Sequence, residues 1–91
     1  MNGGHEKLRQ ALEDLQSRLA EMRTIDPAVA EHLQTTITEA RSVLAKETAA
    51  AEDHEGVADS FGEALRNYEA SHPTLAGNLR SVIDALAQIG I

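Results

Sequence analysis

The stretch LRQALEDLQSRLAEM, residues 8–22, fixes the class of fold. Its large apolar residues are spaced 4, 3, 4 and 3 positions apart, which is the heptad spacing of one helical face. They are Leu8, Leu12, Leu15, Leu19 and Met22. We therefore expect a helix over residues 5–23 with a narrow apolar stripe, as in a coiled coil or an outer helix of a bundle.

The dipeptide Asp26-Pro27 ends this helix and starts the next one. The residue before a proline avoids helical angles, aspartate caps helices, and proline fits the first helical position. We expect a second helix over residues 27–50, joined to the first by a tight hairpin. An acidic connector spans residues 45–56, and the sequence leaves open whether it is helix or loop.

Helical spacing of apolar residues returns over residues 54–70, which predicts a third helix. His72-Pro73 breaks the chain again and starts a fourth helix over residues 73–89. This last segment is apolar over much of its circumference, so it must be covered on more than one side. Its main apolar residues repeat the heptad spacing: Leu75, Leu79, Val82, Leu86 and Ile89.

These segments predict an all-α fold, an antiparallel bundle of about four helices built from two helical hairpins. A chain of 91 residues has room for one domain, so residues 1–91 form a single helical domain. Because the core of so short a chain is small, the bundle closes within one chain or by dimerisation. The absence of cysteine excludes disulfides and thiolate metal sites.

The net charge is −7, and most of the excess lies in the second half of the chain. Residues 1–46 hold six Lys and Arg against seven Asp and Glu, whereas residues 47–91 hold two against eight. Such a chain repels phosphate groups, so we expect no binding to nucleic acid or to anionic membranes. No stretch stays apolar for about 18 residues, and the first residues lack a signal-peptide pattern, so we expect a cytoplasmic protein.

Two groups of residues are weak candidates for metal ligands. Glu69 and His72 have the Glu-x-x-His spacing of di-iron bundles, but the spacing occurs once and His72 lies at the break before Pro73. His54 lies among carboxylates that lack the regular pattern of a calcium loop. We therefore expect no metal and no cofactor, and the weak candidates are His72, Glu69 and His54.

No group of residues has the pattern of a catalytic site. The serines show no recognisable nucleophile setting, and phosphate-binding glycine loops are absent. His5, His32 and His54 fall on predicted polar faces or near the chain terminus. We therefore expect a protein that is not an enzyme.

The C-terminal third is more specific than helical spacing requires. It contains Phe61, then YEASHPTL over residues 68–75, then VIDALAQIGI over residues 82–91. These segments resemble a family of short bacterial proteins catalogued as domain of unknown function 4404, which end in a similar His-Pro-x-Leu stretch and an Ile-Asp-x-Leu-Ala segment closing with Gly-Ile. The resemblance covers residues 61–91 and implies a small, helical, bacterial protein, with no catalytic or ligand residues.

The two heptad stripes favour a non-enzymatic module that binds other proteins or itself, with a homodimer as the expected state. The residues expected at that contact are Leu8, Leu12, Leu15 and Leu19 in the first helix and Leu79, Val82, Ile83 and Leu86 in the fourth. The alternative is a small metal- or pH-responsive regulator that uses His72 with Glu69, or His54 with its neighbouring carboxylates, because histidine changes charge near neutral pH.

Overall fold

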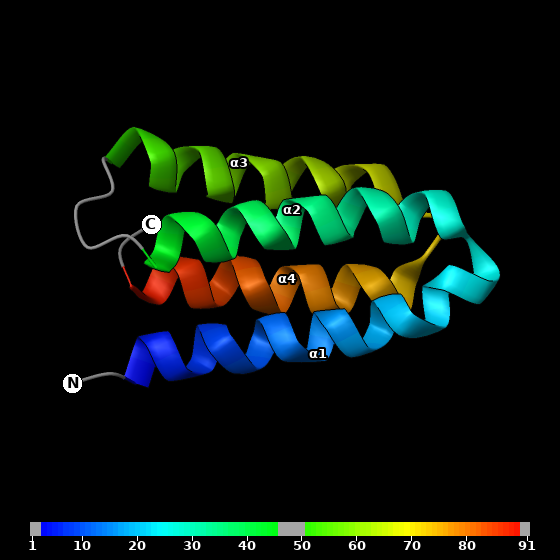
Figure 1. Cartoon of the computed structure of the whole chain (residues 1–91), viewed down its shortest axis with the longest axis horizontal. Helices are drawn as coiled ribbons and strands as arrows, with labels where there is room; N and C mark the ends of the chain where they lie inside the picture. Colours follow the sequence, from blue (N-terminus) through cyan, green and yellow to red (C-terminus); the bar gives the residue numbers. More distant parts are fainter. Residues whose placement is uncertain (1–2, 46–50, 90–91) are drawn as a thin grey trace.

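A computed structural model describes residues 3–45 and 51–89, which form four helices. Consecutive helices run antiparallel, and each packs against two neighbours: α1 against α2 and α4, and α3 against α2 and α4 (Figure 1). The bounds are α1 Gly3–Ile25, α2 Pro27–Ala45, α3 Ala51–Tyr68 and α4 Pro73–Gln88. The predicted all-α antiparallel bundle of four helices is confirmed.

Some helix ends differ from the predicted ones. The third helix begins at Ala51, so residues 51–56 of the predicted connector are helical. Alanine and glutamate are good helix formers, which explains why the helix extends into this acidic stretch. The same helix ends at Tyr68 rather than at residue 70, and residues 69–71 form a turn. Residues 46–50, where a second helix and a connector were both predicted, lie outside the described residues.

One apolar core joins all four helices. The predicted stripes of α1 and α4 both point into it, since Leu15 and Leu79 are 0% exposed. From α2 and α3 come Leu33, Ile37 and Phe61, also 0% exposed. The bundle therefore closes within one chain, and burial of this apolar surface is its main source of stability.

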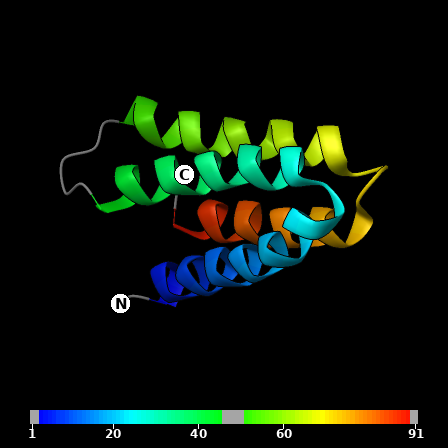
Figure 2. The ribbon, with the colours of Figure 1, turned by 45° about the vertical axis from the view of Figure 1, so that its right-hand side comes forward.

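Both hairpin corners lie at the same end of the bundle (Figure 2). At the first corner the backbone N–H of Val29 donates to Asp26 Oδ1 at 3.4 Å, so Asp26 caps α2 as predicted. At the second, His72 occupies the N-cap position of α4 and Pro73 the first helical position, and the His72 side chain makes no capping bond. This leaves the His72 imidazole available for a contact across the corners.

None of the helices in the described parts of the chain is both long and apolar enough to cross a membrane.

Candidate functional site

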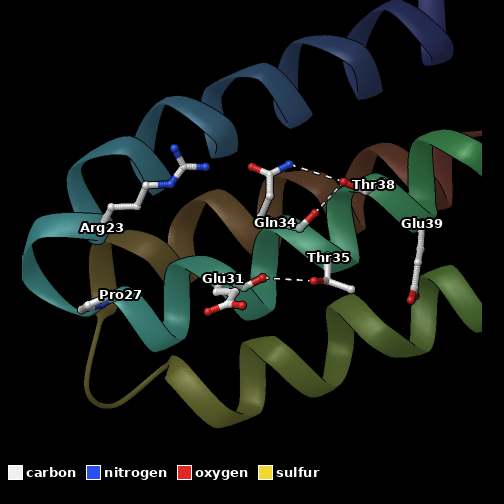
Figure 3. Close-up of a pocket in the computed structure, with 7 residues that line it drawn as sticks. All are labelled: Arg23, Pro27, Glu31, Gln34, Thr35, Thr38 and Glu39. Atoms are coloured by element: carbon white, nitrogen blue, oxygen red, sulfur yellow. Dashed lines mark hydrogen bonds between the residues drawn. The ribbon is translucent and has the colours of Figure 1, made fainter.

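An open depression of about 510 Å³ runs along the outer side of α2 (Figure 3). Helix α2 contributes most of its lining, and α1 adds one arginine from its last turn. We call this surface the α2 face and define it by its lining residues: Arg23, Pro27, Glu31, Gln34, Thr35, Thr38 and Glu39. It lies on the exposed side of α2, which none of the other helices described by the structure covers.

The centre of the α2 face carries Glu31, Gln34, Thr35 and Thr38, of which Glu31 alone is charged. Thr35 Oγ1 donates to the carbonyl oxygen of Glu31 at 3.2 Å, and Thr38 Oγ1 donates to that of Gln34 at 2.9 Å. Because these hydroxyls are bonded to their own helix, the threonine carbons are the part left to contact another surface. The Gln34 amide donates to Thr38 Oγ1 at 3.4 Å, which holds the centre of the face together.

Two further charged residues of this face lie toward its margins. Figure 3 shows Arg23 reaching over the α1 side of α2, whereas Glu39 points toward α3. Arg41, further along α2, donates to Gln16 Oε1 of α1 at 2.5 Å, which places its guanidinium on the α1 side as well. The two sides of α2 therefore differ in charge.

A second polar group, which we call the corner cluster, joins the two hairpins where both corners lie. It consists of Asp26, His32, Tyr68 and His72. His72 Nε2 lies 3.4 Å from Asp26 Oδ2, and the Tyr68 hydroxyl lies 2.7 Å from His32 Nδ1. The Tyr68 ring is 6.0 Å from the His32 ring, edge to face, and 6.4 Å from the His72 ring. The cluster thus links α2, α3 and both corners.

Burial, and next the negative charge of Asp26, raise the pKa of Tyr68 above its ordinary value. Both causes disfavour the phenolate, because it would lose solvent and would face a carboxylate. At neutral pH the phenol therefore keeps its proton, which is available for a hydrogen bond to a neutral His32 ring nitrogen.

The structure separates Glu69 from His72. The Glu-x-x-His motif places two ligands on one face only in an unbroken helix, and α3 ends at Tyr68. Glu69 instead accepts a hydrogen bond from Arg80 at 3.3 Å, while His72 faces Asp26. The His54 side chain lies outside the described residues. Among the side chains that are described, no three His, Asp or Glu converge to hold a metal ion.

The contact residues predicted for α1 and α4 lie inside the bundle. Seven of the eight are buried in the core, and Ile83 is half-buried against it. The sequence identified these residues as contact-forming, but their contacts are with the other helices of the same chain. Contact with a second copy through them would require the bundle to open, so a docking surface must be sought on the outside.

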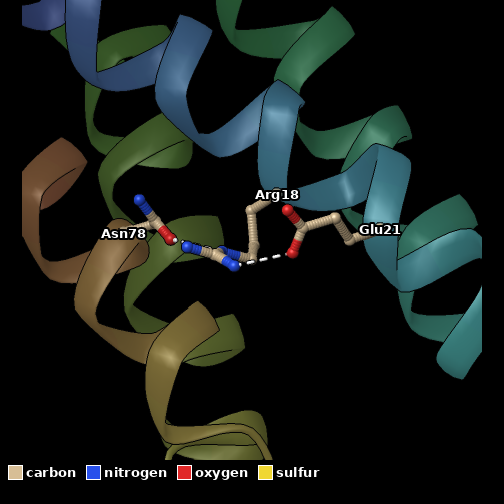
Figure 4. Close-up of polar contacts among 3 residues, drawn as sticks. All are labelled: Arg18, Glu21 and Asn78. Atoms are coloured by element: carbon tan, nitrogen blue, oxygen red, sulfur yellow. Dashed lines mark hydrogen bonds and ion pairs between the residues drawn. The ribbon is translucent and has the colours of Figure 1, made fainter.

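One polar contact on the outside joins the two stripe-bearing helices (Figure 4). Arg18 Nε donates to Asn78 Oδ1 of α4 at 3.4 Å, and the same guanidinium pairs with Glu21 of α1 at 2.7 Å. The Arg18 side chain is about one-third exposed, and this contact links α1 to α4 beside the core.

Sequence reasoning missed the corner cluster and the α2 face. It placed His32 on a polar face, which is correct, but gave no sign that Tyr68, 36 positions away, lies against it. Nor did helical spacing give any expectation for the threonines of α2. Two of these threonines, Thr35 and Thr38, lie on the exposed side of the helix, and their position is what could have indicated the α2 face.

The model of the family described as domain of unknown function (DUF4404) matches residues 8–91. The match extends well beyond residues 61–91, where the resemblance was evident from the sequence. No curated protein and no solved structure matches the chain.

Proposed function

We propose a function from the geometry of this chain, which belongs to the family described as domain of unknown function (DUF4404). It is a non-enzymatic helical module that binds protein through the α2 face. The observation that carries this proposal is the depression of about 510 Å³ on that face, most of whose lining residues are uncharged.

The composition of the α2 face supports protein binding. The chain as a whole carries a net charge of −7, yet four of the seven residues that line this face are uncharged, and the other three, Arg23, Glu31 and Glu39, include both signs. Protein interfaces are depleted of most charged residue types relative to the rest of the surface. The α2 face is accordingly less acidic than the chain as a whole.

Helix propensity gives a second, independent argument. Threonine is less favourable in a helix than alanine by up to about 0.7 kcal/mol per residue, and exposed positions usually carry strong helix formers. Thr35 and Thr38 are both exposed in the middle of α2. Helix stability alone does not explain these residues, whereas a contact that uses their short, branched side chains does.

The hydroxyl groups support a non-enzymatic role. Five of them donate to backbone carbonyls four residues earlier in their own helix, which is not the setting of an activated nucleophile. These are the hydroxyls of Thr35, Thr36, Thr38, Ser60 and Ser81.

A matched pair of variants tests the proposal. Thr35→Glu places a carboxylate in the centre of the α2 face. Ser81→Glu places a carboxylate on the exposed side of α4 instead. Ser81 donates to the carbonyl oxygen of Gly77 at 3.2 Å, just as Thr35 donates to that of Glu31. We expect the parent to associate with itself or with another protein of its source cell, Thr35→Glu to lose that association, and Ser81→Glu to keep it.

Light scattering over a wide concentration range measures self-association. Retention of proteins from the source cell on the immobilised chain measures binding to other partners. A parent chain that associates with nothing, or an equal loss in both variants, would contradict the proposal.

A further inference from the structure

A groove runs between α2 and α3 on the outside of the bundle. It consists of two depressions, of about 270 Å³ and about 190 Å³, which share Thr36, Glu39 and Ser60 as lining residues and are therefore continuous. We call it the α2–α3 groove and define it by the residues on its two sides, which are Thr36, Glu39 and Val43 of α2 and Gly56, Ser60 and Glu63 of α3.

The groove exists because the residues of α3 beside α2 are small. Gly56, Ser60 and Ala64 recur every four positions, so they lie on one side of α3. A Cβ added at Gly56 would meet no atom within 4 Å, and the Ser60 hydroxyl donates to the Gly56 carbonyl oxygen at 2.9 Å. Helix α3 therefore leaves space beside α2 that its own side chains do not fill.

The floor of the groove is apolar and its rims are acidic. Ala40 and Val57 are buried at the floor, and Val43 is partly buried against the same core. Glu39 of α2, which points toward α3 (Figure 3), and Glu63 of α3 are both exposed where they line the smaller depression. The described residues that line the groove include no lysine or arginine. A long basic side chain suits this arrangement, because its carbon stem lies on apolar surface while its charged end meets carboxylates.

The charge of the whole molecule is divided in the same way. Helices α1 and α4, which pack against each other, together carry five basic and five acidic residues. Helices α2 and α3, which also pack against each other, carry two basic and seven acidic residues. The net charge of −7 therefore belongs chiefly to the half of the bundle that contains the groove. A second copy of this chain would be repelled there, whereas a basic partner would be attracted.

We propose that the α2–α3 groove binds a basic amphipathic helix of a partner protein. Such a helix lays its apolar face into a groove between two others. Along α2 the groove extends from His32 to Val43, about 16 Å, which is the length of about three helical turns. The partner's apolar side chains contact the floor, and its lysine or arginine residues pair with Glu39 and Glu63. This contact goes beyond the proposed function, because it adds a second surface beside the α2 face.

Two synthetic peptides provide the probes. The first is an amphipathic helix of about four turns, built from leucine, alanine and lysine, and the second has glutamate in place of every lysine. Fluorescence anisotropy of the labelled peptides measures their binding to the full chain. We expect the parent to bind the basic peptide and not the acidic one, with an affinity that falls as the salt concentration rises.

Two double variants that lose the same net charge test the position of the contact. Glu39→Gln with Glu63→Gln removes both rim carboxylates, and the loss of two exposed ion pairs should weaken binding of the basic peptide about tenfold in Kd. Glu55→Gln with Asp59→Asn removes two carboxylates from the exposed side of α3, outside the groove. This control should keep the Kd within about twofold of the parent's, because exposed charges away from the contact are screened.

A second matched pair fills the groove. Ser60→Lys places an ammonium group of the chain itself between the two acidic rims and should weaken binding of the basic peptide more than about tenfold. Ser81→Lys adds the same charge on α4, where Ser81 likewise donates to the backbone carbonyl oxygen four residues earlier, and should bind as the parent does. Circular dichroism verifies that every variant retains its helices.

The other outcomes overturn the proposal. A parent that binds both peptides alike, or neither, has no site for a basic helix, and equal losses in the two double variants would show attraction to net charge alone. Self-association of the parent that Ser60→Lys removes would make a second copy the occupant. Thr35→Glu, which should disrupt the α2 face, should bind the basic peptide at least as tightly as the parent, so failure of the proposed function and failure of this contact are distinguishable.

Discussion

The surroundings of Tyr68 differ from those of a free tyrosine side chain. It is the only tyrosine in a chain without tryptophan, so its ultraviolet absorbance reports on one group alone. Its ring lies beside His32 and His72, and its pKa is raised first by burial and then by the charge of Asp26. The corner cluster can therefore be followed through a single signal.

Ultraviolet titration of Tyr68 should give a midpoint above the ordinary tyrosine pKa of about 10. In Asp26→Asn the midpoint should fall part of the way back, because burial remains when the charge is removed. The protonated phenol is favoured in the folded state, so this group's contribution to stability is complete below about pH 10 and is lost as pH rises through the folded pKa. A midpoint at or below that of free tyrosine would contradict this account.

Residue by residue, the sequence predicted the core better than the polar contacts. Leu15 and Leu79 were identifiable because helical spacing determines which side of a helix a residue occupies. His32 and Tyr68 were not identifiable as partners, because the spacing within each helix gives no information on how far α2 slides along α3. That offset depends on how core side chains interdigitate, which only the packed structure shows.

The helices themselves were predictable where a chemical signal marks their ends. Asp26-Pro27 and His72-Pro73 gave the starts of α2 and α4 correctly, because caps and prolines act locally. The start of α3 at Ala51 was not predictable. The acidic stretch before it has good helix propensity, which favours a helix. It contains no large apolar residue that a helix could bury in the core, which favours a loop.

Gly77 offers a test of helix stability in α4. It is exposed in the helix interior, and a Cβ added there would meet no atom within 4 Å. Gly77→Ala should raise the free energy of unfolding by about 0.5–1 kcal/mol, because alanine loses less backbone entropy than glycine on folding. Thermal or denaturant unfolding provides the measurement.

The reverse change is the control for this prediction. Ala20 is exposed in the middle of α1, so Ala20→Gly should lower the stability by a similar amount. A loss of stability in Gly77→Ala would show that α4 has a neighbour at this position in solution.

At the scale of the whole molecule, one core shared by four helices predicts one cooperative unfolding transition. Leu15→Ala should lower the free energy of unfolding by about 2–5 kcal/mol while the transition stays single, since Leu15 is fully buried where the helices meet. Ser17→Ala, on the exposed side of the same helix, should change it by less than about 0.5 kcal/mol. Two separate transitions would show that the hairpins fold independently.

The order of packing makes the four helices a closed ring, because α4 lies against α1 just as α1 lies against α2. The start of α1 and the end of α4 share one end of the bundle (Figure 1). The packing of the four helices therefore does not depend on which neighbouring pair is left unconnected. A circular permutant, with a short linker from α4 to α1 and new termini between α2 and α3, should build the same core and keep both corners intact. Its unfolding curve and the titration of Tyr68 should match those of the parent.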